Sequence, residues 1–237
     1  MENVEKFKAE LEVDLDENVT EEVQSEDYLD KLEAEYDKYA AECEAAMEIA
    51  LLKINIFNDA FKRTGKRNPF DRIEYRKKTF KSVRGKCRDR GYALTMSSIK
   101  ENVRDIGGIR IVTKHLNEIP LVIDLIRQIQ EISILSVKDY VETPKDGGYK
   151  SVHLNCQVGV YDPFGGLRMI PLEIQIRTLC MDLWATMDHD INYKALEHHP
   201  EVVKRLQHIA EILDQLEDEY KELSDYVDNK SSDTALQ

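Results

Sequence analysis

The chain has 237 residues, of which 42% are hydrophobic and 33% are charged, and its formal net charge is −13. This composition can bury a core, so it excludes a wholly disordered protein. No apolar run approaches the roughly 20 residues that span a bilayer, and the acidic N-terminus is unlike a signal or transit peptide. The four cysteines are scattered without a CxxC pair, so we expect a cytoplasmic protein with reduced thiols and no structural zinc or disulfide framework.

The charges fall into three blocks along the chain. Residues 1–61 hold 5 Lys or Arg against 19 Asp or Glu, a net charge of −14. Residues 62–114 hold 17 against 5, a net of +12, and residues 115–237 hold 11 against 22, a net of −11. A basic block inside an acidic protein predicts a polyanionic partner, such as nucleotide phosphates or nucleic acid. Alternatively, the basic block pairs with the acidic N-terminal helix of its own chain.

The N-terminal third is expected to be largely helical. Residues 1–26 are acidic and weakly patterned, and we expect a flexible extension there. From Tyr28 to about Phe61, apolar residues recur at three- and four-residue steps, which predicts one long amphipathic helix in a unit spanning 27–64. Residues 72–90 are dense in arginine and lysine, and we expect them to be partly helical and to end at Gly91.

The segment 65–227 is predicted to form one domain. A short helix is expected at 97–103, capped by Ser97 or Ser98, before a buried β-branched strand at 109–113. The later elements are a helix at 121–129, strands at 132–140, 150–160 and 167–177, and helices at 179–196 and from 201 to about 226. The turn residues 162–166 predict a hairpin between the last two strands. This order predicts an α/β (or α+β) mixed β-sheet flanked by helices, followed by a disordered tail at 228–237.

Two clusters suggest phosphate chemistry. In Arg76-x-Lys78-x3-Ser82-x3-Lys86, the last three residues would share one face of a helix and could grip a triphosphate, although a solvated basic face is the alternative. Asp105 precedes Gly107-Gly108 at the mouth of a predicted strand. A carboxylate there suits a divalent metal that carries phosphates, whereas a helix-cap or turn residue is the alternative.

A third cluster lies on a predicted strand. Strand alternation places Glu173, Gln175 and Arg177 on one face, which is costly on a central strand unless the row lines a wet cleft. Asp105 and Glu173 could then share a metal ion, or one could hold it while the other takes a proton. The loop 144–148 delivers Tyr149 and His153 with Lys145 nearby. Tyr149 could stack on a base and Lys145 could meet a phosphate, although a loop tyrosine can also serve packing alone.

A set of motifs runs in order from about residue 70 to 225. The motifs are Arg76-x-Lys78-x3-Ser82-x3-Lys86, Asp105-x-x-Gly108-x-Arg110, Asp139-Tyr140 through Pro144-Lys145, Gly148-Tyr149-x-Ser151-x-His153, Glu173-Ile-Gln-Ile-Arg-Thr178, and Trp184-Ala185-x-x-x-His189 with Tyr193-Lys194. In this order they resemble the synthetase domain of the RelA/SpoT family, and the short chain resembles its small alarmone synthetases.

The resemblance implies a nucleotidyltransferase-like fold and a specific reaction. Such proteins move the β,γ-pyrophosphate of ATP onto the ribose 3′-hydroxyl of GDP or GTP, which gives (p)ppGpp and AMP. Asp105 would bind Mg²⁺, and Glu173 would assist the metal or deprotonate the 3′-hydroxyl. The residues expected to hold ATP are Arg76, Lys78, Ser82, Lys86 and Arg110, with the two arginines flanking adenine. Tyr149 would stack on guanine, with Lys145, His153 and Gln175 around the acceptor nucleotide.

The resemblance also implies a homotetramer assembled through the terminal helices, with no membrane partner and no nucleic acid required for catalysis. Alternatively, both terminal helices pack only on their own sheet. Two further functions stay open: the same transfer onto an adenine nucleotide or the 3′ end of tRNA, and a non-catalytic nucleotide-sensing oligomer. The net charge of −11 over residues 115–237 disfavours a tRNA acceptor.

Overall fold

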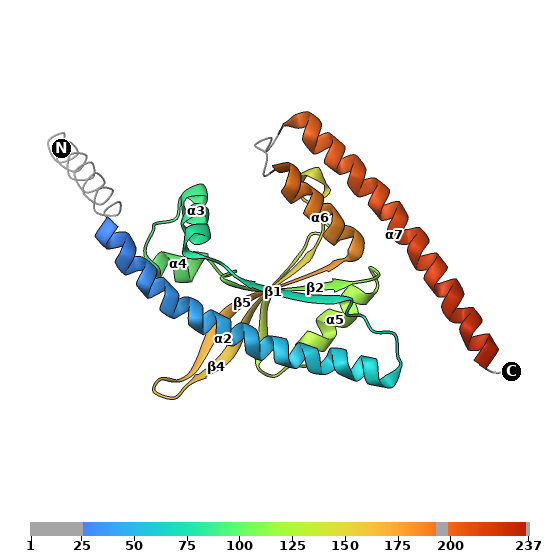
Figure 1. The fold of residues 1–237 in the computed structure, drawn as a ribbon, viewed down its shortest axis with the longest axis horizontal. Helices are drawn as coiled ribbons and strands as arrows, with labels where there is room; N and C mark the ends of the chain where they lie inside the picture. The colour runs from blue at the N-terminus through green and yellow to red at the C-terminus, as the bar shows by residue number, and fades with distance from the viewer. Residues whose placement is uncertain (1–25, 193–198, 236–237) are drawn as a thin grey trace, which may run out of the picture.

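A five-stranded sheet lies at the centre of the computed structural model, which describes residues 26–192 and 199–235 (Figure 1). Its strands are β1 (Arg72–Lys77), β2 (Gly107–Thr113), β3 (Ile132–Asp139), β4 (Val152–Asp162) and β5 (Gly166–Thr178). They lie in the order β1-β2-β5-β4-β3. The β2–β5 pair is parallel and the other three are antiparallel, including the predicted β4–β5 hairpin. The predicted mixed sheet is therefore confirmed.

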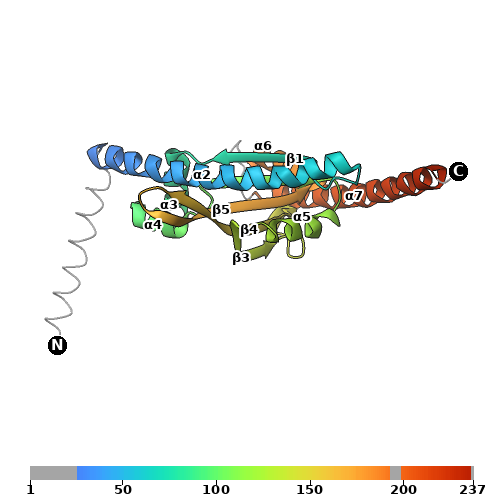
Figure 2. The ribbon, with the colours of Figure 1, turned by 90° about the horizontal axis from the view of Figure 1, so that it is seen from below.

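The strands of the sheet lie in the sequence between two long helices, α2 (Glu26–Thr64) and α7 (Pro200–Ala235). The shorter helices are α3 (Phe80–Arg90), α4 (Met96–Asn102), α5 (Glu118–Arg127) and α6 (Leu179–Asn192), with a 3₁₀ turn η1 (Asp146–Gly148). Figure 2 shows α2 running along the sheet, while α7 projects past it at the opposite end of the molecule. None of the helices in the described ranges is long and apolar enough to cross a membrane.

The sheet has one apolar face, and α2 covers it. Gly107 of β2 lies so close to α2 that an added Cβ would meet the Cys43 carbonyl oxygen at 3.0 Å. Alternation along β2 therefore turns Ile109 and Ile111 toward α2, where both are buried in the main core. Leu172, Ile174 and Ile176 of β5 and alternate residues of β4 join the same core. The intervening residues of these strands must project from the opposite face.

A second, smaller core joins α6 to α7. Trp184 packs with Leu206, Ala210 and Leu213, and its indole Nε1 donates a hydrogen bond to the Leu206 carbonyl at 2.9 Å. Farther along α7, Tyr220 stacks on the buried ring of His115 with centroids 4.6 Å apart. Arg67 forms an ion pair with Asp228 at 3.2 Å. These contacts hold α7 against the sheet domain at two places.

The largest difference from the sequence prediction is at residues 72–90. The expectation that this segment is partly helical is confirmed for Phe80–Arg90, but residues 72–77 form strand β1, which we did not predict. β1 is an edge strand, and charged side chains are common on edge strands because they prevent pairing with other chains. Its apolar pattern was therefore too weak to reveal a strand. The expected end at Gly91 is correct, since this residue has the left-handed conformation of a helix cap.

Smaller corrections concern helix ends. Thr95 caps α4, accepting a hydrogen bond from the Ser98 backbone at 3.3 Å, so neither Ser97 nor Ser98 is the cap. The tail expected to be disordered from residue 228 continues α7 as helix to Ala235, because adding residues to a formed helix costs little. The expected flexibility of residues 1–25 and the helical assignment beyond Asn192 concern positions outside the described ranges.

Candidate active site

The register of the strands builds a polar site on the face opposite α2. One row across the sheet joins Arg76 of β1, Gly108 of β2, Glu173 of β5 and Asn155 of β4. The next row joins Glu74, Arg110, Gln175 and His153 on the same strands. The two rows place residues from four separate stretches of sequence side by side. Gly108, which has no side chain, leaves space between Arg76 and Glu173.

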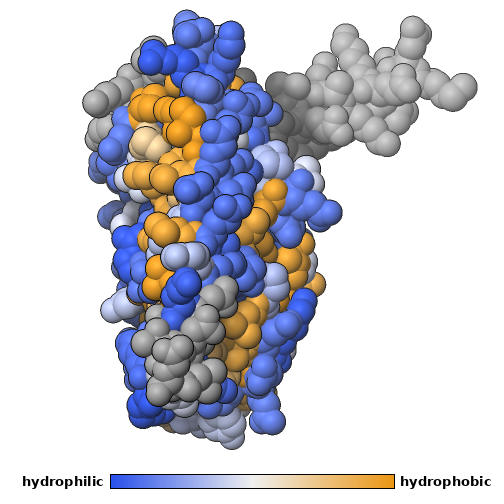
Figure 3. All heavy atoms as spheres, turned by 90° about the vertical axis from the view of Figure 1, so that its right-hand side faces the viewer, coloured by the Kyte–Doolittle hydropathy of each residue, from blue (hydrophilic) through white to orange (hydrophobic). Residues whose placement is uncertain are grey.

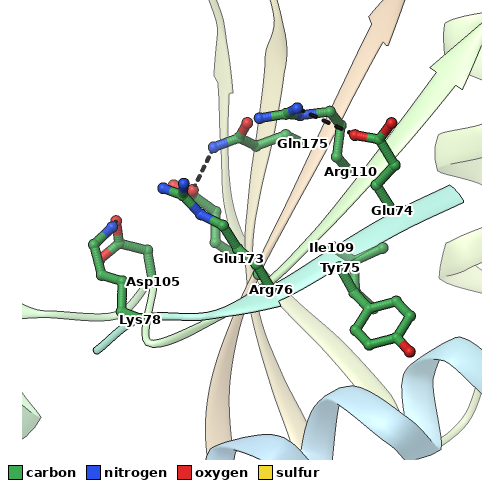
Figure 4. Close-up of a pocket in the computed structure, with 10 residues that line it drawn as sticks. Glu74, Tyr75, Arg76, Lys78, Asp105, Ile109, Arg110, Glu173 and Gln175 are labelled. Carbon is green, nitrogen blue, oxygen red and sulfur yellow. Dashed lines mark hydrogen bonds and ion pairs between the residues drawn. The ribbon is translucent and has the colours of Figure 1, made fainter. Parts of the chain in front are cut away.

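A pocket of about 180 Å³ opens over these rows (Figure 4). It is lined by Glu74, Tyr75, Arg76, Lys78, Asp105, Gly108, Ile109, Arg110, Glu173 and Gln175. Six of the predicted site residues therefore line one pocket: Arg76, Lys78, Asp105, Arg110, Glu173 and Gln175. Figure 4 shows Lys78 and Asp105 at one end of this pocket, with Arg110 and Glu74 at the other.

Asp105 is held by two of the predicted phosphate-binding lysines. It lies just before β2, and its two carboxylate oxygens accept hydrogen bonds from Lys78 Nζ at 2.5 Å and Lys86 Nζ at 2.8 Å. Burial alone would raise the pKa of the Asp105 carboxyl, but the hydrogen bonds and charges of the two lysines outweigh it and lower this pKa. Asp105 is thus an ionised carboxylate inside a basic cluster.

Glu173 lies in a chain of polar side chains. Gln175 Nε2 donates to Glu173 Oε2 at 2.7 Å, and His153 Nδ1 lies 3.3 Å from Glu173 Oε1. The other ring nitrogen of His153 is 2.8 Å from the Tyr149 hydroxyl. Burial would raise the pKa of the Glu173 carboxyl, but the hydrogen bonds from His153 and Gln175 lower it below its ordinary value. An ionised carboxylate is the form that can accept a proton.

Tyr149 is the centre of an aromatic cluster. Its ring lies 6.1 Å from Tyr140 and 6.0 Å from both His153 and Trp184. The ammonium of Lys145 lies 4.2 Å from the centroid of Tyr140 and 5.1 Å from that of Tyr149. These distances are typical of cation–π contacts. The predicted acceptor residues Lys145, Tyr149 and His153 are therefore linked directly, and Gln175 joins them through Glu173.

The glycine loop before Tyr149 packs tightly against α7. Gly147 and Gly148 both have positive φ, of 78° and 95°, which favours glycine. A Cβ at Gly148 would come within 2.5 Å of the Ala210 Cβ, so no side chain fits there. The position of Tyr149 consequently depends on α7 as well as on the sheet.

One predicted site residue lies outside this arrangement. Ser82 is exposed on α3, one turn before Lys86, and it does not line the pocket. The expectation that Lys78, Ser82 and Lys86 share a helix face is wrong, because Lys78 precedes the N-cap Thr79. Lys78 and Lys86 are brought together by Asp105 instead.

Sequence reasoning missed two groups that shape the site. Glu74 lines the pocket and forms an ion pair with Arg110 at 3.2 Å, which the strand register of β1 and β2 would have revealed had β1 been recognised. Asp182 lies in the first turn of α6, where its carboxylate contacts three arginines, and no local sequence pattern indicates this. Trp184 and His189 of the last motif lie on α6, whereas Tyr193 and Lys194 are outside the described ranges.

Asp105 and Glu173 also face a second hollow of about 390 Å³. Its lining includes the cationic side chains of Lys86, Arg104 and Lys138. Within residues 26–192 and 199–235, no group of three or more His, Cys, Asp or Glu forms a complete metal cage. Two ionised carboxylates that face two hollows, each also lined by three cationic side chains, nevertheless fit Mg²⁺, which takes one or two protein carboxylates and completes its shell with phosphates and water.

Comparisons with known proteins agree with this geometry. A profile of the region found in RelA / SpoT proteins matches residues 75–198. The GTP pyrophosphokinase YwaC of Bacillus subtilis (strain 168) is 32% identical over 184 residues, which cover 77% of this chain and 87% of that protein. The crystal structure of Bacillus subtilis small alarmone synthetase 1 bound to its product pppGpp has a TM-score of 0.74 at 26% identity, covering 81% of this chain and 98% of that one. The same enzyme bound to AMPCPP has a TM-score of 0.70 at 26% identity, covering 83% and 99%.

Proposed function

The chain belongs to the RelA/SpoT family, and from that membership we propose that it is a (p)ppGpp synthetase. It transfers the β,γ-pyrophosphate of ATP to the ribose 3′-hydroxyl of GDP or GTP and releases AMP. The observation that carries this proposal is the pocket in which Asp105, Glu173 and the cations Arg76, Lys78 and Arg110 converge. Transfer of a phosphoryl group depends mainly on positioning and on neutralising negative charge, and this pocket offers both.

The donor nucleotide occupies the pocket over β1 and β2. Arg76 and Arg110 stand on neighbouring strands and can flank the adenine, because guanidinium groups stack on aromatic faces. Lys78 and Lys86 neutralise the triphosphate; to do so they exchange contacts with Asp105 for contacts with phosphate oxygens. Ser82 on α3 supplies a hydroxyl farther along the same basic surface.

The acceptor nucleotide lies on the β4 and β5 side of Glu173. Tyr149 stacks on guanine, with Lys145, His153 and Gln175 around the nucleotide. The acceptor oxygen attacks the β-phosphorus, the bond from that phosphorus to the oxygen bridging to the α-phosphorus breaks, and AMP leaves. Glu173 accepts the proton of the 3′-hydroxyl, a role suited to its ionised state and to its fixed place beside His153 and Gln175.

Mg²⁺ is the proposed cofactor, held by the carboxylates of Asp105 and Glu173. When bound, it supplies neutralisation of the phosphate charge and orientation of the β-phosphoryl group. The protein's own residues have two roles: before the nucleotide binds, Lys78 and Lys86 hold Asp105 ionised, and the hydrogen bonds to Glu173 fix the position of its carboxylate in the pocket.

The experiment is a comparison of acceptors. The purified protein is incubated with Mg²⁺, ATP and each of GDP, GTP, GMP, ADP and tRNA, and the products are separated by anion-exchange chromatography. We expect a more highly phosphorylated guanosine nucleotide to accumulate together with AMP. An adenosine product would favour an adenine acceptor, tRNA modification with steep salt dependence would favour a tRNA acceptor, and unaltered nucleotides would favour a non-catalytic sensor.

We also propose a homotetramer that forms through the terminal helices. Ile212, Leu216, Leu223 and Val227 are exposed on α7 at four- and seven-residue steps, which places them on one face. Figure 3 shows bands of apolar side chains on the side of the molecule where α7 lies. Leu52 and Ile56 of α2 are exposed as well. Apolar surface of this extent is typical of an interface.

The proposed setting is the cytoplasm, where ATP and guanosine nucleotides are available together. The four cysteines are free thiols, which suits a reducing compartment. We propose that neither a membrane nor a nucleic acid takes part in catalysis, since nucleotide phosphates account for the basic block at residues 62–114.

A further inference from the structure

Asp182 is a nearly buried carboxylate that joins three strands. It lies in the first turn of α6, and its side chain is only 10% exposed. Its oxygens lie 2.6 Å from Arg72 Nη2, 2.9 Å from Arg177 Nε and 3.8 Å from Arg110 Nη1. These arginines belong to β1, β5 and β2, which are neighbours in the sheet. One carboxylate therefore contacts arginine side chains from all three strands.

The three arginines differ in their freedom to move. The Arg177 side chain is 3% exposed, so it cannot turn away into water, whereas that of Arg110 is 36% exposed. Arg110 and Arg177 contact the same oxygen of Asp182, so their like charges lie close together, and burial with the charge of Arg110 lowers the pKa of the Arg177 guanidinium. Removing the carboxylate between them would leave this repulsion uncompensated. Arg110 is the residue that would move away.

We propose that Asp182 is a positioning residue for ATP: by compensating Arg177, it keeps Arg110 in the wall of the donor pocket. This inference rests on the proposed function, because it assigns Arg110 to the donor nucleotide. Glu74 also accepts a hydrogen bond from Arg110, at 3.2 Å, but its side chain is 44% exposed, so water screens its charge more strongly than that of Asp182, which is 10% exposed. Asp182 is itself absent from the lining of the pocket, so it acts through the arginine and not through the nucleotide.

The test is the isosteric variant Asp182→Asn. Binding of AMPCPP, whose α,β-methylene bridge cannot be cleaved by the transfer, is measured by calorimetry, and KM for each nucleotide is measured by turnover. We expect the affinity for AMPCPP to fall about tenfold, which corresponds to the loss of one charge-assisted contact. KM for the guanosine acceptor should be unchanged. Asp190→Asn, on the exposed end of the same helix, is the matched control and should bind as the wild type does.

A double-mutant cycle separates positioning from a general effect on folding. If Asp182 acts through Arg110, then Asp182→Asn should cause no further loss of AMPCPP affinity in an Arg110→Gln background. The proposal is overturned if Asp182→Asn binds AMPCPP as tightly as the wild type, if the loss persists in the Arg110→Gln background, or if only the acceptor KM rises.

A second variant and a comparison of AMPCPP binding with product formation separate the possible outcomes. Should thermal unfolding show that Asp182→Asn does not fold, Asp182→Glu, which keeps the charge but displaces it by one methylene, is compared instead. A loss of at least about threefold is expected because charge-assisted contacts depend on geometry, and wild-type affinity contradicts the proposal. A wild-type protein that binds AMPCPP but makes no alarmone would refute the proposed synthetase activity alone, whereas one that does not bind AMPCPP would refute both.

Discussion

At the scale of single residues, the site depends on two ionised carboxylates with different surroundings. Asp105 is surrounded by the ammonium groups of Lys78 and Lys86, whereas Glu173 is bounded by His153 and Gln175. The arrangement around Asp105 suits a carboxylate whose lysine partners also contact the phosphates of a nucleotide. The arrangement around Glu173 suits a group that takes a proton and is held in place while it does so.

Replacing Glu173 by glutamine tests this division of roles. Glu173→Gln keeps the size of the side chain but cannot accept the proton, so we expect the transfer rate to fall by at least about a hundredfold. AMPCPP affinity, measured by calorimetry, should stay within about threefold of the wild type because Asp105, the other proposed Mg²⁺ ligand, and the arginines and lysines of the pocket are intact. Glu48→Gln, at an exposed position of α2, is the control. Wild-type turnover by Glu173→Gln would show that another group accepts the proton.

Gly108 provides a second residue-scale prediction. A Cβ at this position would meet nothing closer than the Arg76 carbonyl oxygen at 3.9 Å, and its backbone is not among those with positive φ. The fold therefore tolerates a side chain, but that side chain would project into the pocket beside Arg76 and Glu173. We expect Gly108→Val to leave the melting temperature unchanged or higher and to weaken AMPCPP binding about tenfold, a loss of about 1.4 kcal/mol.

Gly85→Ala is the contrasting variant, since nothing lies within 4 Å of an added Cβ in α3. It should raise the free energy of unfolding by about 0.5–1 kcal/mol without affecting AMPCPP binding. Unaltered AMPCPP affinity in Gly108→Val would mean that the nucleotide does not occupy the space above Gly108.

At the scale of elements, α2 supports the site from the other side of the sheet. The Tyr36 hydroxyl donates a hydrogen bond of 2.7 Å to the Lys78 carbonyl, between the end of β1 and the start of α3. The Lys78 amide in turn donates to the Ile106 carbonyl at 2.8 Å, beside Asp105. A helix on the opposite face of the sheet thus fixes the backbone that carries Lys78, a proposed phosphate-binding residue.

Tyr36→Phe tests this support. The ring keeps its packing on Phe80, whose centroid is 5.4 Å away, but the hydrogen bond to Lys78 is lost. We expect the free energy of unfolding, measured by urea denaturation, to fall by about 1–2 kcal/mol and AMPCPP affinity to fall a few-fold. Tyr161→Phe, at a position 76% exposed, should change neither quantity. Equal stability of Tyr36→Phe and the wild type would rule out a supporting role for this contact.

The elements also show what the sequence could and could not predict. β5 was predictable because it is central, so Ile174 and Ile176 alternate with Glu173 and Gln175. β1 was not, because at the edge of the sheet its residues are mostly charged and exposed. The ion pairs of Asp182 depend on strand order, which brings together arginines up to 110 residues away. Local sequence patterns do not indicate such contacts, and the resemblance to a family indicated only those site residues that lie within shared motifs.

At the scale of the whole molecule, α7 has two faces with different roles. Leu206, Ala210 and Leu213 face inward, where they pack on Trp184 and support the loop that carries Tyr149. Leu216 and Leu223 face outward, with 54% and 60% of their surface exposed. An assembly that covers the outer face would stabilise the helix on which the loop of the proposed acceptor site packs.

Charges on this outer face should prevent assembly. We expect the Leu216→Glu/Leu223→Glu variant to elute as a smaller species than the wild type, with its molar mass measured by light scattering, because burying two carboxylates is costly. Gln215→Glu, beside the apolar stripe on the same helix, should retain the wild-type mass. A wild-type protein with the mass of one chain, or a double variant with unaltered mass, would contradict assembly through α7.

The most direct test of the central claim is the stoichiometry of the reaction. Wild-type protein, Mg²⁺, ATP and GDP are followed in time by anion-exchange chromatography, in parallel with a reaction that contains 3′-deoxyguanosine diphosphate. Transfer of pyrophosphate to the 3′-oxygen predicts AMP and ppGpp in equal amounts with GDP, and neither product with the 3′-deoxy acceptor. Formation of ADP and phosphate in place of AMP, or a pyrophosphorylated product from the 3′-deoxy acceptor, would contradict the reaction proposed for this pocket.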